Sequence, residues 1–209
     1  MKLHDGLGPN PRLVRMFIAE KKLDIASEVV DLMAGANRRE PYTSKNAFGQ
    51  LPSLELDDGR VISETVVICE YLDELHPEPP LIGRSPEERA EARMWLRRVE
   101  LHVTEPLANG FRFGEGRKLF EGRIRLIPQA ADDLKALARE GLAKLDGLIA
   151  GRSFIAGERL TLADIVLFAF LDFGNSVGQK LDPANRNLST WFARMAARPS
   201  AAASAQPRS

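Results

Sequence analysis

The sequence predicts two domains, a small α/β domain followed by a larger all-helical domain. The first part of the chain alternates β-prone and amphipathic helical runs in the order strand, helix, strand, hairpin, helix. A segment rich in proline and glycine follows, and from Pro86 onward only helical periodicity is seen. A length of 209 residues is sufficient for two such domains, each with its own core. We expect an α/β domain over 1–81, a linker over 82–85 and a helical domain over 86–209.

The first elements predict a parallel crossover unit. Residues 1–5 are β-prone, and glycines and a proline then break the chain before a long amphipathic run that begins at Pro11. Asn10 before Pro11 is typical of a helix N-cap followed by the first helical residue. A second β-prone run covers 28–32, and 34–47 is expected to be irregular and partly helical.

A hairpin and a closing helix complete the predicted first domain. Residues 53–56 and 60–63 alternate apolar and polar side chains around the turn-forming sequence Asp57-Asp58-Gly59. Apolar positions at helical spacing over 64–76 predict a helix that the following prolines end.

The second domain is expected to contain only helices. The periodicity predicts them at 86–110, at 120–149 with a break near Pro128, at 162–174 and at 188–197. Residues 200–209 carry Ala, Ser and Pro without an apolar face, so we expect a flexible tail there.

The composition excludes several classes of function. The 29 basic and 29 acidic side chains cancel, so no net charge favours binding to nucleic acid or to an anionic membrane. The single cysteine, Cys69, cannot form an internal disulfide, and no signal peptide is recognised at the start. No apolar stretch approaches the roughly 20 residues of a membrane helix. We therefore expect a soluble, cytoplasmic protein.

Two motifs in the first domain and one in the second carry more specific information. Residues 46–52 read Asn-Ala-Phe-Gly-Gln-Leu-Pro ahead of the hairpin, and Ser63-Glu64-Thr65 opens the next helix. Thr161-Leu162-Ala163-Asp164 predicts a capping box at the start of a buried helix, with a structural role for Thr161 and Asp164.

With the order of the elements, these motifs make nearly the whole chain resemble the glutathione transferase family. The resemblance implies a thioredoxin-like first domain, glutathione as co-substrate with no other cofactor, and a homodimer in which Phe48 contacts the other subunit. The chain is most similar to bacterial and fungal members of an atypical type that lacks the usual Tyr, Ser or Cys catalytic residue. Gly8-Pro9-Asn10-Pro11-Arg12 stands where these members have a Ser-Pro-Asn-like segment, so the departure is at Gly8.

The resemblance assigns glutathione contacts within the first domain. It implies a cis bond before Pro52, which would present the N–H and C=O of Leu51 to the cysteinyl residue of glutathione. The helix start at Thr65 would take the γ-glutamyl carboxylate and Glu64 the adjacent ammonium group. An ordinary trans bond at Pro52, and simple capping of the helix by Ser63 or Thr65, are the structural alternatives.

Other contacts complete the expected glutathione site, and the acceptor pocket belongs to the second domain. Lys45 and Gln50 could reach the glycyl end of glutathione or be solvated, and Pro9 and Asn10 lie on the segment expected near the sulfur. The electrophile would lie between the domains against Phe111, Phe113 and Phe120, unless these rings belong to the core.

The sequence offers few candidates for the groups that activate the glutathione thiol. Between Asp5 and Arg12 the chain offers no Tyr, Ser or Cys, so backbone amides and the Asn10 side chain are the available groups. Alignment with the atypical members places Ala108 and Arg112 where they carry Ser and His, and Arg112 could stabilise a thiolate. Asn10 and Arg112 are therefore the candidate catalytic residues.

Alternatives to a conjugating enzyme remain open. A glutathione-binding interaction protein without chemistry is one, because Gly8 and Ala108 replace hydroxyl positions; a glutathione-dependent reductase, dehalogenase or peroxidase is another. Cys69 lacks a Cys-x-x-Cys partner and is interpreted as a packing residue. The three histidines are too scattered in the sequence to predict a metal site.

Overall fold

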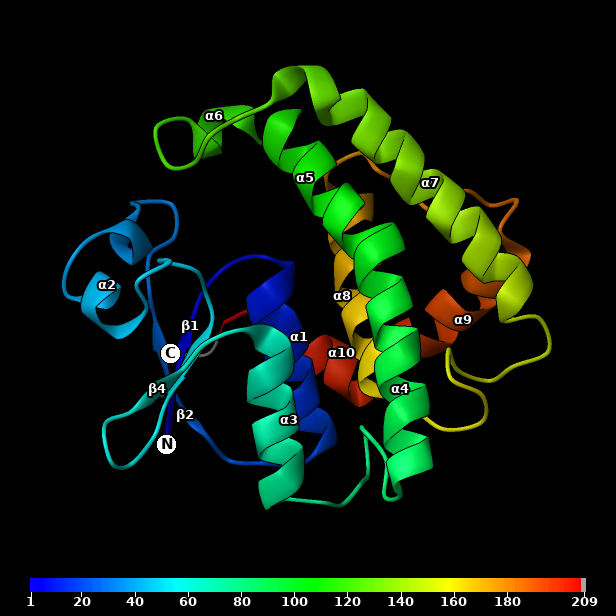
Figure 1. The fold of residues 1–209 in the computed structure, drawn as a ribbon, viewed down its shortest axis with the longest axis horizontal. Coiled ribbons are helices and arrows are strands. Elements are labelled where there is room, and N and C mark those ends of the chain that lie inside the picture. The colour runs from blue at the N-terminus through cyan, green and yellow to red at the C-terminus, as the bar shows by residue number, and fades with distance from the viewer. Residues whose placement is uncertain (208–209) are drawn as a thin grey trace. The chain divides into compact units, whose positions relative to one another are not determined.

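The computed structural model describes residues 1–207 and divides the chain into two compact units (Figure 1). The first unit comprises Met1–Leu81 together with the chain from Arg198 onward, and the second comprises Ile82–Ala197. The first is a sheet covered by helices and the second is entirely helical, so the predicted fold class is confirmed. None of the helices within the described chain combines the length and the apolar composition needed to cross a lipid bilayer.

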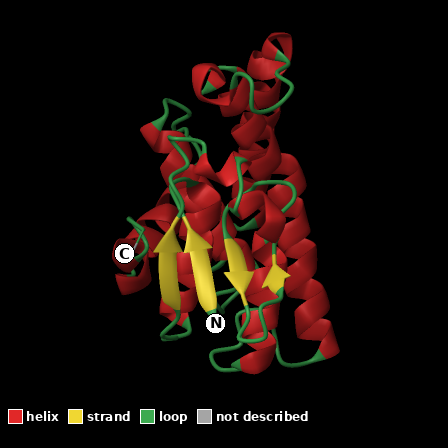
Figure 2. Ribbon diagram, turned by 90° about the vertical axis from the view of Figure 1, so that its left-hand side faces the viewer, coloured by secondary structure: helices red, strands yellow, loops and turns green. Residues whose placement is uncertain are grey.

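The first unit is built on a four-stranded mixed sheet in the order β2-β1-β3-β4 (Figure 2). β1 (Lys2–Asp5) pairs in parallel with β2 (Ala26–Val29) and antiparallel with β3 (Ser53–Glu55), which forms the predicted hairpin with β4 (Val61–Ile62). β2 lies two to three residues earlier than expected, because its parallel register with β1 places Ala26 opposite Lys2.

Helices cover both faces of this sheet. α1 (Pro9–Glu20) and α3 (Thr65–Leu75) lie on one face, where Leu3 and Leu54 are buried beneath them (Figure 1). The short α2 (Tyr42–Lys45), which follows the 3₁₀ turn η1 (Ala36–Arg38), lies beyond the opposite face (Figure 1). Side chains alternate across the strands, so His4 and Glu55 belong to the α2 face.

The expectation of a flexible tail is wrong for its first residues, which form α10 (Pro199–Ala203). This helix packs on α1. Arg198 makes two hydrogen bonds to Glu20, at 2.6 and 2.9 Å, and the Nε atom of Arg15 donates to the Ser204 carbonyl at 3.0 Å. Because these partners lie far apart in the sequence, local composition did not reveal them. The last two residues of the expected tail, 208–209, lie outside the described residues.

The second unit contains helices joined by connections of different lengths, the longest of which lies between α7 and α8. They are α4 (Pro86–Val99), the π-helical turn η2 (Glu100–Thr104), α5 (Glu105–Phe113), α6 (Arg117–Phe120), the 3₁₀ turn η3 (Pro128–Ala130), α7 (Ala131–Leu148), α8 (Leu162–Ser176) and α9 (Arg186–Ala196). The helix expected over 120–149 begins only after Pro128, which opens η3 and lacks an amide N–H for a helix interior.

Helix α8 is the core of the second unit. Ten consecutive residues, 162–171, are buried in it. The predicted capping box is confirmed: the Asp164 carboxylate accepts hydrogen bonds from the Thr161 N–H at 2.9 Å and from the Ile155 N–H at 2.8 Å. The same carboxylate accepts from Trp191 Nε1 at 2.9 Å, so it joins α8 to α9. This arrangement confirms the structural role predicted for Thr161 and Asp164.

Candidate functional site

The first element of the site is the segment between β1 and α1. The helix begins at Pro9, with Gly8 as its N-cap residue at φ 112° and ψ 173°. The expectation that Asn10 caps the helix is therefore wrong, because a glycine backbone in this region allows the helix to start two residues earlier. Pro9 and Pro11 have no amide N–H, so Asn10 carries the backbone donor among these first helical residues.

A buried ion pair lies beneath this segment. Asp5 ends β1 and is fully buried, and Arg15 from α1 donates to its carboxylate at 2.5 Å. The same guanidinium donates to the Gly6 carbonyl at 3.0 Å, while the Gly6 N–H donates to Asp5 at 2.8 Å. The pair fixes the path of the chain just before α1, and the guanidinium balances the charge of the carboxylate.

The second element is the peptide before Pro52, and the predicted cis bond between Leu51 and Pro52 is confirmed. Leu51 lies against Gly6: a Cβ atom added to Gly6 would approach its Cδ1 atom to 2.8 Å. The Val30 carbonyl would lie 3.3 Å from the same Cβ atom, so a larger residue at position 6 would require the Leu51 side chain to shift. No hydrogen bond reaches the N–H or the C=O of Leu51 from elsewhere in residues 1–207.

The third element is the start of α3. Glu64 is the N-cap residue, at φ 68° and ψ 119°, and no side chain caps the helix. The first bond of the helix runs from the Ile68 N–H to the Glu64 carbonyl at 2.9 Å, which leaves the amides of the first turn without intrahelical partners. The alternative in which Ser63 or Thr65 simply caps the helix is therefore wrong.

The backbone of Glu64 is itself informative. A positive φ is uncommon for a residue other than glycine, and such outliers cluster at ligand-binding sites. Here the conformation turns the chain so that the exposed Glu64 side chain and the half-buried Thr65 lie together at the positive end of the helix dipole. This place suits a ligand that carries both a carboxylate and an ammonium group.

The two other expected glutathione contacts have different surroundings. The Lys45 amine lies 2.6 Å from Glu55 and 3.4 Å from His4, on the α2 face of the sheet. His4 Nε2 also lies 2.8 Å from the Glu55 carboxylate, and the hydrogen bonds of Glu55 with Lys45 and His4 lower its pKa to about 2, with Lys45 as the larger cause. Gln50 is exposed and precedes Leu51 directly. A role for Lys45 at the glycyl end of glutathione stays a prediction.

The expected catalytic and acceptor residues of the second unit lie around α5. Arg112 donates from Nη1 to Asn109 at 2.9 Å, and Ala108 is buried on the same helix. The Phe111 ring makes edge contacts with Phe120 at 6.3 Å and with Phe173 at 4.9 Å between centroids. Phe111 therefore contacts aromatic side chains of its own unit while it is itself half-buried. Phe113 is half-buried. The acceptor pocket stays a prediction.

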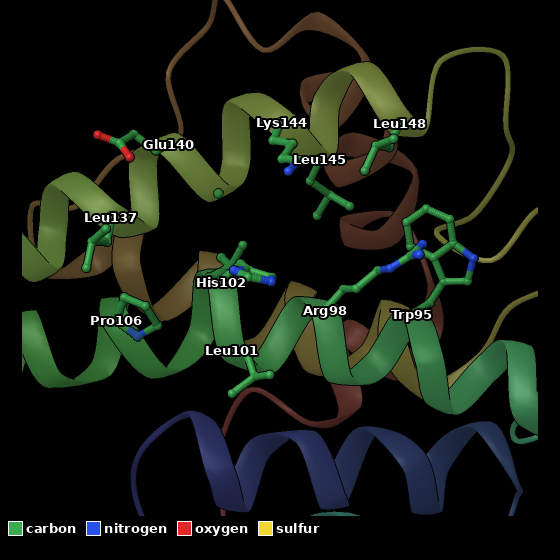
Figure 3. Close-up of a pocket in the computed structure, with 12 residues that line it drawn as sticks. Trp95, Arg98, Leu101, His102, Pro106, Leu137, Glu140, Lys144, Leu145 and Leu148 are labelled. Carbon is green, nitrogen blue, oxygen red and sulfur yellow. The ribbon is translucent and has the colours of Figure 1, made fainter.

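The second unit also contains a cavity of about 580 Å³ between α4–η2–α5 and α7 (Figure 3). Its walls include Trp95, Leu101, Pro106, Leu137 and Leu148, with Arg98, His102 and Lys144 as the basic side chains (Figure 3). None of the residues expected to bind glutathione or the electrophile lines it.

In the described part of the chain, neither Cys69 nor a cluster of metal-ligating side chains forms a second reactive site. Burial, with the nearby Asp73 and Glu70 carboxylates as lesser causes, raises the pKa of Cys69 well above its ordinary value, so the side chain is held as a thiol. This agrees with its interpretation as a packing residue. Within the described residues, no group of three or more His, Cys, Asp or Glu side chains could hold a metal ion.

The sequence motif 46–52 begins at Asn46 but gives no role for its side chain, and the other residues that hold the Leu51 segment in place lie outside the motif. Tyr42 and Asn46 both donate to the Gln50 carbonyl, at 2.6 and 2.9 Å, and Asn37 donates to the Gly49 carbonyl at 2.6 Å. The sequence could have suggested a buried role for Tyr42, because it is the one aromatic residue in the otherwise polar run 34–47. Its acceptors are main-chain carbonyls, which a side-chain pattern does not disclose.

The fold and the site define a class: a sheet domain with an uncapped helix start beside a cis-proline peptide, followed by a helical domain. Residues 8–75 match the glutathione S-transferase N-terminal domain and 127–199 the C-terminal domain. The chain is 31% identical to glutathione S-transferase 2 of Saccharomyces cerevisiae, over 92% of this chain and 84% of that protein. It is 33% identical to FtsZ-localized protein A of Caulobacter vibrioides, over 94% of this chain and 86% of that protein.

A solved structure agrees with these matches. A glutathione S-transferase domain-containing protein of Marinobacter aquaeolei VT8 superposes with a TM-score of 0.89 at 35% identity, covering 96% of this chain and 99% of that one. The chain belongs to the glutathione S-transferase family, and its first unit is the thioredoxin-like domain of that family. It is a glutathione S-transferase with a glutathione-dependent activity.

Proposed function

We propose that the protein conjugates glutathione to small hydrophobic electrophiles, with the tripeptide held by the first unit. The observation that carries the proposal is the uncapped start of α3 at a residue with positive φ, in the same unit as a Leu51 peptide with unpaired N–H and C=O groups. The γ-glutamyl carboxylate binds the Thr65 N–H and hydroxyl, and Glu64 takes the ammonium group. Leu51 pairs with the cysteinyl residue as a one-residue strand addition.

The thiol is activated near the start of α1 without a protein hydroxyl from residues 5–12. Lowering a thiol pKa by roughly two units from about 8.5 requires about 2.7 kcal/mol of differential stabilisation. A helix terminus supplies about 0.3 to 1 kcal/mol and at most about 2. Each hydrogen bond to the thiolate adds about 1.5 to 3 kcal/mol, so the N–H and side-chain amide of Asn10 close the gap. Pro9 shapes this helix start. The family resemblance is the basis for assigning Arg112 as a further cation that stabilises the thiolate.

In the reaction, the glutathione thiolate attacks an electrophilic carbon. A sulfur–carbon bond forms, the leaving group departs with its electron pair, and the thiol proton has already passed to solvent. We assign Phe111 and Phe113 to the acceptor pocket and Lys45 and Gln50 to the glycyl end of glutathione. The basis for these assignments is the family resemblance.

Steady-state kinetics with 1-chloro-2,4-dinitrobenzene and glutathione test the proposal, with calorimetry of glutathione binding alongside. Conjugation with a bound tripeptide is the expected result, and Asn10→Ala is expected to lower kcat while the protein remains folded. Arg112→Ala is expected to lower turnover or glutathione affinity; if both are unchanged, the Arg112 assignment is wrong. A protein that neither binds glutathione nor turns over would refute the proposal.

A second candidate is a glutathione-binding interaction protein that has lost the chemistry. Gly8 and Ala108 stand at the family's hydroxyl positions, and one relative at 33% identity is named as an FtsZ-localized protein. This candidate predicts normal glutathione binding with no conjugation and no peroxide reduction. The kinetic and calorimetric measurements therefore separate the two functions.

We also propose that the protein acts as a cytoplasmic homodimer in detoxification. Phe48 supports a dimer contact because 77% of its surface is exposed while Arg38 donates to its carbonyl at 2.7 Å, so the side chain projects from a tethered loop. Light scattering at micromolar concentration is expected to give the mass of a dimer, and a monomer would refute the assembly. The mass of Phe48→Ser, a substitution at an exposed position, tests the contact itself.

A further inference from the structure

Hydrogen bonds from buried side chains fix the two peptide groups that precede Leu51. The Tyr42 hydroxyl and the Asn46 side-chain amide donate to the Gln50 carbonyl at 2.6 and 2.9 Å. The Asn37 amide donates to the Gly49 carbonyl at 2.6 Å. These side chains are nearly inaccessible, with exposed fractions of 2% for Asn37, 5% for Tyr42 and 6% for Asn46.

Two donors on one carbonyl determine the direction of the next amide. The Gln50 C=O and the Leu51 N–H belong to one peptide group, and this bond is not among the cis bonds of the described chain. In a planar trans peptide the C=O and N–H point in opposite directions. When Tyr42 and Asn46 hold the Gln50 oxygen on the buried side, the Leu51 N–H is directed away from them, where no described residue accepts from it.

The donors are held in place by their own surroundings. Tyr42 lies on α2 with its ring edge-on to His4 at 6.0 Å between centroids, and its hydroxyl also lies 3.1 Å from Ser53 Oγ. Asn46 ends the same helix through a backbone bond to the Tyr42 carbonyl at 2.9 Å. Burial raises the pKa of Tyr42, so the phenol keeps the proton that it donates across the neutral range.

We propose that Tyr42 and Asn46 are positioning residues for glutathione, and that they act by orienting the Gln50–Leu51 peptide whose N–H pairs with the cysteinyl residue. This inference rests on the proposed glutathione site. Neither side chain touches the tripeptide or the sulfur. Their loss therefore weakens the binding of glutathione without changing the ionisation of the bound thiol or the binding of the second substrate.

Tyr42→Phe tests the proposal, because it removes the hydroxyl and keeps the buried ring. Loss of one neutral hydrogen bond is expected to raise the calorimetric Kd for glutathione by about threefold to tenfold. Tyr71→Phe is the matched control: Tyr71 is the other tyrosine of the chain, half-buried on α3, and its hydroxyl makes no hydrogen bond within residues 1–207. Its Kd is expected to stay within about twofold of the wild-type value.

The kinetic readouts distinguish positioning from a general structural role. With 1-chloro-2,4-dinitrobenzene, Tyr42→Phe is expected to raise the KM for glutathione, and to leave the KM for the electrophile, kcat at saturating glutathione and the pH profile of kcat unchanged. The Tyr42→Phe, Asn46→Leu double variant is expected to raise the Kd for glutathione by more than the product of the two single fold-changes. In each single variant the remaining donor still holds the Gln50 carbonyl.

The outcomes of this experiment are separable. If wild-type protein releases no heat with glutathione, the proposed function fails and the inference fails with it. If the wild type binds and folded Tyr42→Phe binds equally well, with at most a lower Tm, the positioning role alone is wrong. Should the double variant not fold, the volume-conserving Tyr42→Phe decides the question by itself.

Discussion

Gly8 carries the most specific test of the helix start at which we place the sulfur. Its φ of 112° and ψ of 173° lie in a region that only glycine adopts without strain. A Cβ atom added there would meet no atom within 4 Å, so the cost of Gly8→Ala is conformational and not steric. We expect a loss of about 1 to 3 kcal/mol in the free energy of unfolding, with Tm lower by about 2 to 12 °C.

Gly147 provides the matched control for this substitution. A Cβ atom there also meets nothing within 4 Å, but Gly147 lies in α7 and its φ is not positive. Gly147→Ala is expected to stabilise the protein by about 0.5 to 1 kcal/mol. Urea unfolding and calorimetric Tm measure both variants. If Gly8→Ala is as stable as the wild type, the strained backbone is not present in solution and the reasoning is refuted.

Three further perturbations test the packing and charges around the site. Glu55→Gln is expected to make the free energy of unfolding depend less on pH between pH 4.5 and about 2. The lowered pKa of Glu55 stabilises the folded protein above the ordinary value of 4.5, and this stabilisation is lost as the pH falls toward 2. An unchanged pH dependence in urea unfolding would contradict the ion pairing. Asp164→Ala is expected to lower the free energy of unfolding by more than about 3 kcal/mol, since the buried donors of Trp191 and Ile155 lose their acceptor. A decrease below about 1 kcal/mol in the same assay would show that these hydrogen bonds contribute little to stability. Arg198→Met keeps the aliphatic stem and removes two hydrogen bonds to Glu20, so α10 is expected to be cleaved faster in limited proteolysis; equal rates would count against this attachment.

The order of elements in both units was predictable because local patterns determine it. Alternation around Asp57-Asp58-Gly59 marks the hairpin, and helical periodicity marks α1, α3 and α8. The cis bond before Pro52 was predicted from the motif and not from local propensity. These features need only neighbouring residues or a family pattern.

The structure differs from the sequence-based expectations where residues far apart in the chain determine it. α10 forms because Arg198 meets Glu20, a pairing across 178 positions that no local window contains. α1 begins at Pro9 and not at the expected Pro11 because Gly8 adopts a positive φ. A glycine in the sequence permits this conformation but does not predict it. The hydrogen bonds of Tyr42 and Asn46 escaped prediction for a related reason, since the identity of a main-chain acceptor depends on the fold.

A crystal structure of the protein soaked with glutathione would show directly whether the first unit holds the tripeptide through Leu51 and Thr65. We expect the cysteinyl residue to exchange hydrogen bonds with the N–H and C=O of Leu51 and the γ-glutamyl carboxylate to lie on the Thr65 amide, with the sulfur near Asn10. Glutathione bound elsewhere would contradict the proposal, as would a site that stays empty at saturating concentration when no neighbouring molecule in the crystal covers Leu51 and Thr65.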